Sequence, residues 1–76
     1  MVNVNKLRGR IVEAGLSITE LADRIGIDKA TFYRKISSGG ETFLIKEADA
    51  ISRELNLTGD EVNAIFFAQF VASNAN

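Results

Sequence analysis

The chain has 76 residues, of which 46% are apolar and 25% are charged, and its formal net charge is −1. A chain of this length forms one small domain, expected here to span residues 1–76, and leaves little room for a large catalytic cleft. It contains no cysteine and no histidine, which excludes disulfides, thiol nucleophiles, imidazole catalysis and the usual zinc ligand sets. We therefore expect a globular protein that is not an enzyme and that holds no metal or cofactor.

Five helices are predicted from the spacing of apolar residues, and no alternating run is long enough for a strand, so the sequence predicts an all-α fold. The first helix begins near Asn3 or Asn5, either of which can cap it, and Gly15 ends it. Its apolar face consists of Val4, Leu7, Ile11 and Ala14.

The second and third predicted helices are short and closely spaced, within residues 17–36. Ser17 and Glu20 form a capping box that begins the second helix, and Gly26 supplies the positive φ needed to end it. Asp28 caps the third helix, expected from Lys29 to about Ser37. The residues expected to face the core are Leu21, Ala22, Ile25, Ile27, Phe32 and Ile36.

A loop at Ser37–Gly40 leads to the last two predicted helices. The fourth helix has Ile45, Ala48, Ile51 and Leu55 at helical spacing. Thr58 and Glu61 form a second capping box, and the final helix is expected to continue to Val71. Residues 73–76 are expected to be a frayed tail.

The final helix has more apolar residues than one face requires. Phe67, Phe70 and Val71 extend beyond the stripe that contains Phe66. Two interpretations stay open: these three side chains form the interface of a homodimer, or the last turn folds back over the core.

Positive and negative charges are unevenly distributed along the chain. Residues 1–37 carry seven basic and four acidic side chains, whereas residues 38–76 carry two basic and six acidic ones. The resulting charges, +3 and −4, are consistent with a one-sided DNA-binding domain despite the negative total.

Two short helices joined by a glycine turn cross at a steep angle, so the second helix projects from the domain. A projecting helix has about the width that the major groove of B-DNA admits. The segment from Ser17 to Ile36, SITELADRIGIDKATFYRKI, resembles the helix-turn-helix of phage repressor and Cro-like (XRE-type) regulators, above all small prophage-encoded ones. The resemblance covers residues 5–66 and implies a compact five-helix, lambda-repressor-like domain. The chain departs from the family pattern at Lys35, which replaces an apolar residue, and at Ile18, which replaces a phosphate-binding polar residue.

The resemblance implies that Lys29, Ala30 and Arg34 read DNA bases. Arginine can donate two hydrogen bonds to guanine, lysine can bind either guanine or a phosphate, and alanine can contact a thymine methyl group. Tyr33 is expected either to contact a phosphate or sugar or to pack on the first helix.

Other residues are candidates for contacts with the DNA backbone. Because Ile18 cannot donate a side-chain hydrogen bond, contact at the start of the second helix is expected through a backbone amide, assigned to Ser17. The remaining candidates are Lys35, Lys46 and the amides of Gly39 and Gly40. Lys46 is equally consistent with a solvated helix face.

These features predict a sequence-specific transcriptional regulator that binds a double-stranded DNA operator, as a monomer or as a homodimer. The alternative is a protein-binding module, such as an antirepressor or antitoxin-like partner, that uses its Phe-rich final helix. No signal peptide or membrane-spanning run is recognisable, so a cytoplasmic protein is expected. No small-molecule effector is expected either.

Overall fold

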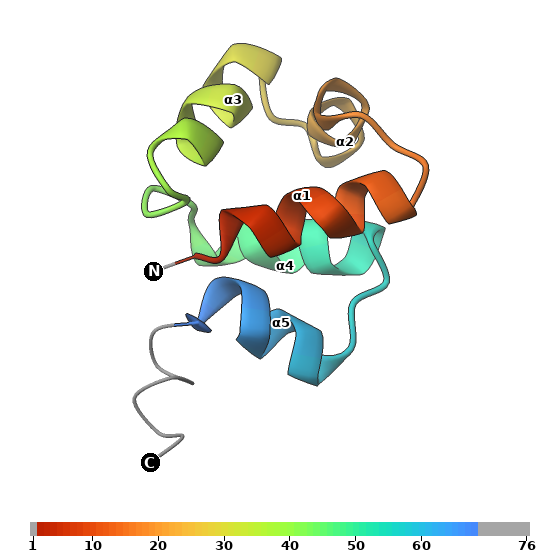
Figure 1. The fold of residues 1–76 in the computed structure, drawn as a ribbon. Coiled ribbons are helices and arrows are strands. Elements are labelled where there is room, and N and C mark those ends of the chain that lie inside the picture. Colours follow the sequence, from red (N-terminus) through yellow and green to blue (C-terminus); the bar gives the residue numbers. More distant parts are fainter. Residues whose placement is uncertain (1, 69–76) are drawn as a thin grey trace.

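The computed structural model describes residues 2–68 and contains five helices and no strand within that range. The helices are α1 (Val4–Glu13), α2 (Ile18–Ile25), α3 (Lys29–Ser37), α4 (Ile45–Glu54) and α5 (Gly59–Phe66). Figure 1 shows α1 and α4 across the middle, with α2 and α3 on one side of them and α5 on the other. The all-α prediction is therefore confirmed.

Side-chain caps define where most of these helices begin. Asn3 caps α1 by accepting the Lys6 amide at 3.0 Å. At the start of α5, Thr58 Oγ1 accepts the Glu61 amide at 3.2 Å, and the Glu61 carboxylate accepts the Thr58 amide at 2.9 Å. The predicted capping box at this helix is confirmed, and of the two candidates for the first cap the structure selects Asn3.

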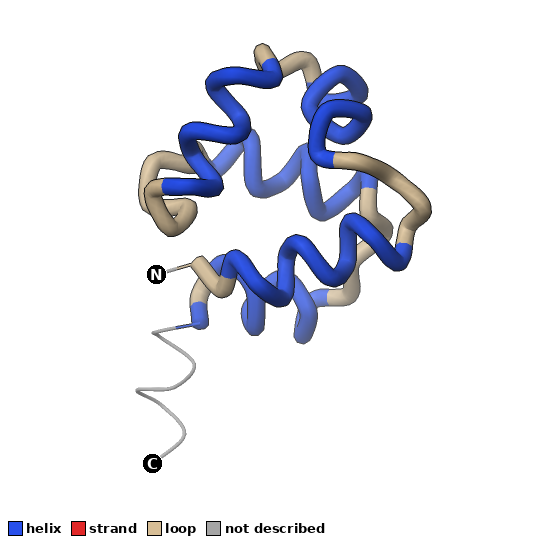
Figure 2. Tube along the Cα trace, turned by 45° about the horizontal axis from the view of Figure 1, so that its top comes forward, coloured by secondary structure: helices blue, strands red, loops and turns tan. Residues whose placement is uncertain are grey.

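All five helices contribute side chains to one apolar core. The tilted view in Figure 2 shows how the helices are arranged relative to one another. Phe43, in the loop before α4, lies edge-on to Phe32 at 5.6 Å and to Phe66 at 6.4 Å between ring centroids. It thereby joins the third helix to the last. The buried residues of the core are Leu7, Ile11, Leu21, Ala22, Phe32, Ile36, Ile51, Leu55, Ile65 and Phe66.

Three expectations about apolar residues need correction. Ile45 is 88% exposed, because it is the first residue of α4 and projects beyond the part of that helix covered by the core. Ala14 is exposed at the C-cap of α1. The final helix was expected to continue through Phe67, but α5 ends at Phe66, and Phe67 has left helical geometry with φ −123° and ψ 34°. Phe70 and Val71 lie outside the described residues.

Candidate nucleic-acid interface

The α2–turn–α3 unit is built by local hydrogen bonds that the sequence specifies. Ser17 Oγ accepts the Glu20 amide at 3.0 Å, and the Glu20 carboxylate accepts the Ser17 amide at 3.1 Å. Gly26 ends α2 at φ 76°, a left-handed conformation that glycine adopts without steric cost. The predicted capping box and glycine turn are therefore confirmed.

The start of α3 is fixed equally closely. One carboxylate oxygen of Asp28 accepts the Ala30 amide at 3.1 Å and the Thr31 amide at 3.2 Å. The turn before it is held by the Ile27 amide, which donates to the carbonyl of the fully buried Ala22 at 2.9 Å. The small Ala22 side chain lets the two helices approach closely, and Figure 1 shows α3 at the upper left of the molecule with α2 to its right.

Burial defines which face of α3 is outermost. Phe32 and Ile36 are buried at 0% and 2% exposure, and successive residues on a helix are separated by about 100°. Ala30 and Arg34 consequently lie opposite the buried pair, and both are exposed. Lys29, also exposed, lies at the first turn.

Two side chains of α3 flank the base-reading candidates. Thr31 is partly buried, and its Oγ1 accepts a hydrogen bond from Arg34 Nη2 at 3.3 Å. Tyr33 is 45% exposed. The outer face of α3 therefore presents two cations and a small apolar side chain, with the half-exposed Tyr33 beside them.

Lys35, a predicted contact with the DNA backbone, forms an ion pair within the protein. Its Nζ lies 2.6 Å from Glu47 Oε1, and the two side chains are only 16% and 12% exposed. Burial raises the pKa of the Glu47 carboxyl. Hydrogen bonds from the Leu44 amide and from Lys35, together with the positive charges of Lys35 and Lys46, lower it by more, so the pKa lies below its ordinary value. The Lys35 ammonium is therefore engaged by a partly buried carboxylate on α4.

The loop amides expected to hold phosphates are also occupied. The Gly39 amide donates to the Ile36 carbonyl at 3.0 Å, and the Gly40 amide donates to the Lys35 carbonyl at 2.9 Å. The Ser17 amide is used within its capping box, although the Ser17 hydroxyl proton remains able to donate. Lys46 is exposed at the start of α4.

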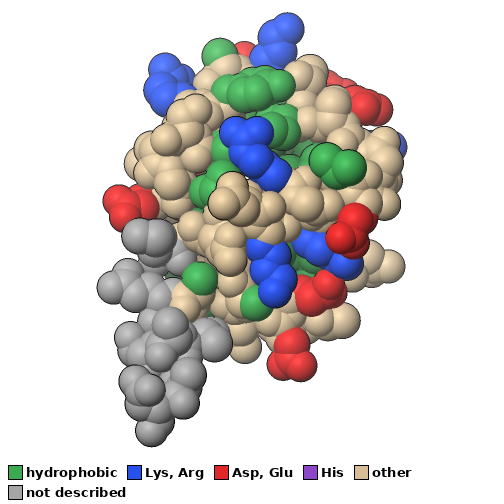
Figure 3. Space-filling view, viewed as in Figure 1, with side chains coloured by type: hydrophobic (Ala, Val, Ile, Leu, Met, Phe, Trp, Pro, Cys, Tyr) green, Lys and Arg blue, Asp and Glu red, His purple; other side chains and the backbone are tan. Residues whose placement is uncertain are grey.

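The basic side chains of residues 2–68 fall into two groups. One group forms ion pairs between helices or along a helix: Arg10 with Glu61, Arg24 with Glu54, Lys35 with Glu47, and Arg53 with Asp49. None of the ion pairs in this part of the chain involves Lys29 or Arg34. On the face shown in Figure 3, Lys and Arg side chains lie over α3 and the middle of the molecule, whereas most acidic ones lie toward the edges.

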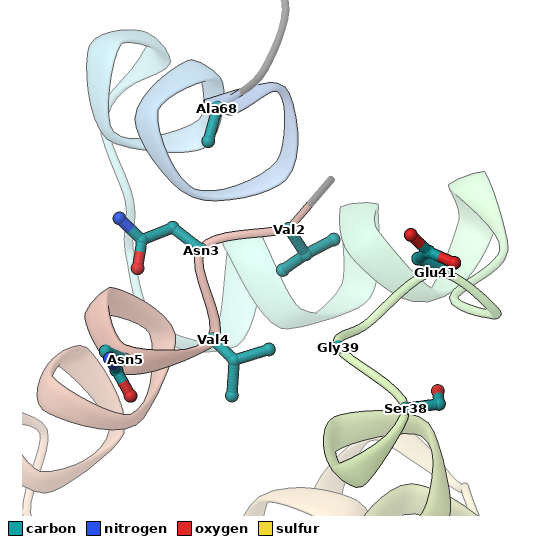
Figure 4. A pocket seen from close by; sticks show the side chains of 8 residues that line it. All are labelled: Val2, Asn3, Val4, Asn5, Ser38, Gly39, Glu41 and Ala68. Atoms are coloured by element: carbon teal, nitrogen blue, oxygen red, sulfur yellow. The ribbon is translucent and has the colours of Figure 1, made fainter.

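A pocket of about 760 Å³ lies between the N-terminal segment and the loop after α3 (Figure 4). Its lining provides one carboxylate, from Glu41, and no basic side chain, and it pairs no nucleophile with a base. Within residues 2–68 no cluster of acidic side chains is arranged to hold a metal ion. The lining residues are Val2, Asn3, Val4, Asn5, Ser38, Gly39, Glu41 and Ala68.

Most of the chain matches a known protein family. The family described as the Cro/C1-type HTH DNA-binding domain matches residues 6–65, which include all of α2 and α3. No significant match was found among curated proteins or solved structures. None of the described helices is long and apolar enough to cross a bilayer.

Proposed function

The chain belongs to the Cro/C1-type helix-turn-helix DNA-binding family, and from this premise we propose that it is a phage repressor-like or Cro-like regulator that binds an operator through α3. Binding of this kind controls transcription by blocking or recruiting RNA polymerase at the operator. The observation that carries the proposal is the outer face of α3, where Lys29 and Arg34 are exposed and take part in none of the described ion pairs.

The three outward residues at the start and middle of α3 have distinct roles in this proposal. Arg34 donates to the N7 and O6 atoms of a guanine, a contact worth about 1–3 kcal/mol of discrimination. Ala30, on the same face, contacts a thymine methyl group. Lys29 binds a guanine or a neighbouring phosphate at the first turn.

Contacts with the DNA backbone are assigned to side chains that the structure leaves accessible. These are the Ser17 hydroxyl at the start of α2, the half-exposed Tyr33, and Lys46 at the start of α4. Such contacts set the register of the domain on the duplex and carry no sequence information by themselves.

The proposed regulator acts as a homodimer that includes Phe67 in its interface. Phe67 is 50% exposed at the end of α5, and it borders a groove also lined by Leu44 and Ile45, which are 51% and 88% exposed. A large exposed apolar patch commonly marks an interface. Phe70 and Val71, assigned to the same interface, lie outside the described residues. A two-fold dimer would place two α3 helices about 34 Å apart on a near-palindromic operator.

The same apolar groove supports a second candidate function, capture of another protein. A DNA-binding domain presents its reading helix to DNA, whereas a protein-binding module would use the groove lined by Leu44, Ile45 and Phe67. The two functions differ in salt dependence, since phosphate neutralisation makes duplex affinity fall steeply with salt. No small-molecule effector enters either proposal.

Selection from a random pool of DNA duplexes tests the proposed function. We expect the wild-type protein to enrich a near-palindromic motif, and Arg34→Ala to lose the preference at one guanine in each half-site. Arg53→Ala is the matched control, because Arg53 is an exposed arginine on α4 that pairs with Asp49. A single enriched half-site would reject the dimer, and no enrichment at any salt concentration would favour the protein-binding function.

A further inference from the structure

Glu47 joins the reading helix to the start of the next helix through one oxygen atom. Its Oε1 accepts hydrogen bonds from Lys35 Nζ at 2.6 Å and from the Leu44 amide at 2.8 Å. The carboxylate therefore fixes the first turn of α4 and the last turn of α3 simultaneously. Both charged side chains are largely removed from solvent, so their separation would leave a charge poorly hydrated.

The backbone of Lys35 holds the loop that separates the two helices. Its carbonyl accepts the Gly40 amide at 2.9 Å and the Ser38 hydroxyl at 2.8 Å. Gly40 itself is buried, with φ 77°, and packs against Val2. At this one position the backbone carbonyl is bonded to the loop and the side-chain ammonium is bonded to α4.

The position of Lys35 on α3 gives this pair control over the rotation of the helix. Lys35 lies about 60° from Phe32 around the helix axis, at the edge of the buried face. Phe32 and Ile36 secure the buried face of α3 by apolar contacts. The 2.6 Å hydrogen bond from Lys35 adds a link at the edge of that face, and lengthening it would separate two charges that are largely removed from solvent. A rotation that lengthened this bond would also turn Arg34 away from its place opposite the core.

We propose that Lys35 and Glu47 are positioning residues, which set the angle at which α3 presents Arg34 to DNA and contact no nucleotide themselves. This inference rests on the proposed DNA-reading function. It assigns the departure from the family pattern at Lys35 to a link between helices rather than to an additional phosphate contact.

The sign of one substitution separates positioning from phosphate binding. If Lys35 held a phosphate, Glu47→Gln would release its ammonium and remove a negative charge, and DNA binding would tighten. If the pair positions α3, the same substitution weakens specific binding. Glutamine keeps an oxygen for the Leu44 amide, so the start of α4 is preserved, but it lacks the negative charge that holds the Lys35 ammonium.

The experiment measures affinity for the selected duplex and for a scrambled duplex over a range of salt concentrations. We expect Lys35→Met and Glu47→Gln each to weaken binding to the selected duplex about tenfold, with the double variant no weaker than either single one. Their affinity for the scrambled duplex and the slope of log K against log[salt] stay at wild-type values. Lys46→Gln, the matched control, weakens both duplexes and reduces the slope by about 0.9.

Unchanged or tighter binding by Glu47→Gln would overturn the inference, as would a reduced salt slope in Lys35→Met. Urea unfolding of each variant establishes that it is folded under the assay conditions. If Lys35→Met is unfolded, Glu47→Gln alone distinguishes the two explanations, because positioning predicts weaker DNA binding by this variant and phosphate contact predicts tighter binding. A wild-type protein that binds no duplex selectively would instead reject the proposed function.

Discussion

The buried Gly40 allows a substitution whose cost follows directly from the geometry. A β-carbon at this position would lie 2.6 Å from Val2 Cβ and 2.9 Å from each of its methyl groups, at a backbone φ of 77°. The left-handed backbone costs an L-residue roughly 1–2 kcal/mol, and overpacking adds about 1–3 kcal/mol. We expect Gly40→Ala to destabilise the protein by about 2–5 kcal/mol.

Gly39→Ala is the matched control. Gly39 has φ 83°, but a β-carbon added there would have no other atom within 4 Å, so this variant carries the backbone cost alone. Thermal unfolding measures the difference, because about 1 kcal/mol shifts the midpoint of so small a domain by roughly 4–8 °C. Val2→Gly should remove most of the difference, whereas Val2→Ala, which retains Cβ, should remove only part of it. Equal midpoints for Gly39→Ala and Gly40→Ala would refute the reasoning.

Three further predictions concern the cap of α3, the core and pH. Asp28→Ala should lower the free energy of unfolding by about 1 kcal/mol in urea titrations, whereas Asp28→Asn, which keeps an acceptor, should lose less; equal losses would contradict the capping role. Phe32→Ala should cost about 3–5 kcal/mol and the exposed Tyr33→Ala less than about 0.5 kcal/mol by the same assay, and a comparable loss at Tyr33 would contradict the assigned rotation of α3. Because the folded pKa of Glu47 lies below its ordinary value of 4.5, its stabilising contribution is present above pH 4.5 and is lost as pH falls through the folded pKa. As the pH is lowered from about 7 to about 3, the thermal unfolding midpoint should therefore fall less for Glu47→Gln than for wild type. Glu41→Gln, which changes an exposed acid outside the described ion pairs, is the control and should follow wild type. The same pH dependence in Glu47→Gln and wild type would refute a stabilising role for the Glu47 carboxylate.

The local parts of the fold are predictable because their signals lie within a few residues of one another. Ser17 and Glu20 specify the start of α2, Gly26 specifies its end, and Asp28 specifies the start of α3. These signals act through backbone amides of the same turn, so they do not depend on tertiary packing. The predicted bounds of α3, Lys29 to Ser37, agree with the structure for this reason.

Features that depend on packing between separate helices were less predictable. Lys35 and Glu47 are twelve residues apart, and no helical spacing connects them, so only the arrangement of α3 and α4 reveals their ion pair. Ile45 has the right spacing for the apolar stripe of α4, but spacing alone does not show how far the core extends along a helix. The occupied amides of Gly39 and Gly40 likewise depend on how the loop folds back onto α3.

The central claim, that Arg34 reads a base in the major groove, is tested most directly by removing the atom it should contact. Each guanine of the selected duplex is replaced in turn by 7-deazaguanine, which lacks the N7 acceptor, and binding is measured for wild type and Arg34→Ala. We predict that replacing one particular guanine in each half-site weakens binding by the wild-type protein about tenfold. The same replacement should leave the affinity of Arg34→Ala unchanged. Equal losses in the two proteins, or no loss at any guanine in the wild type, would contradict the claim.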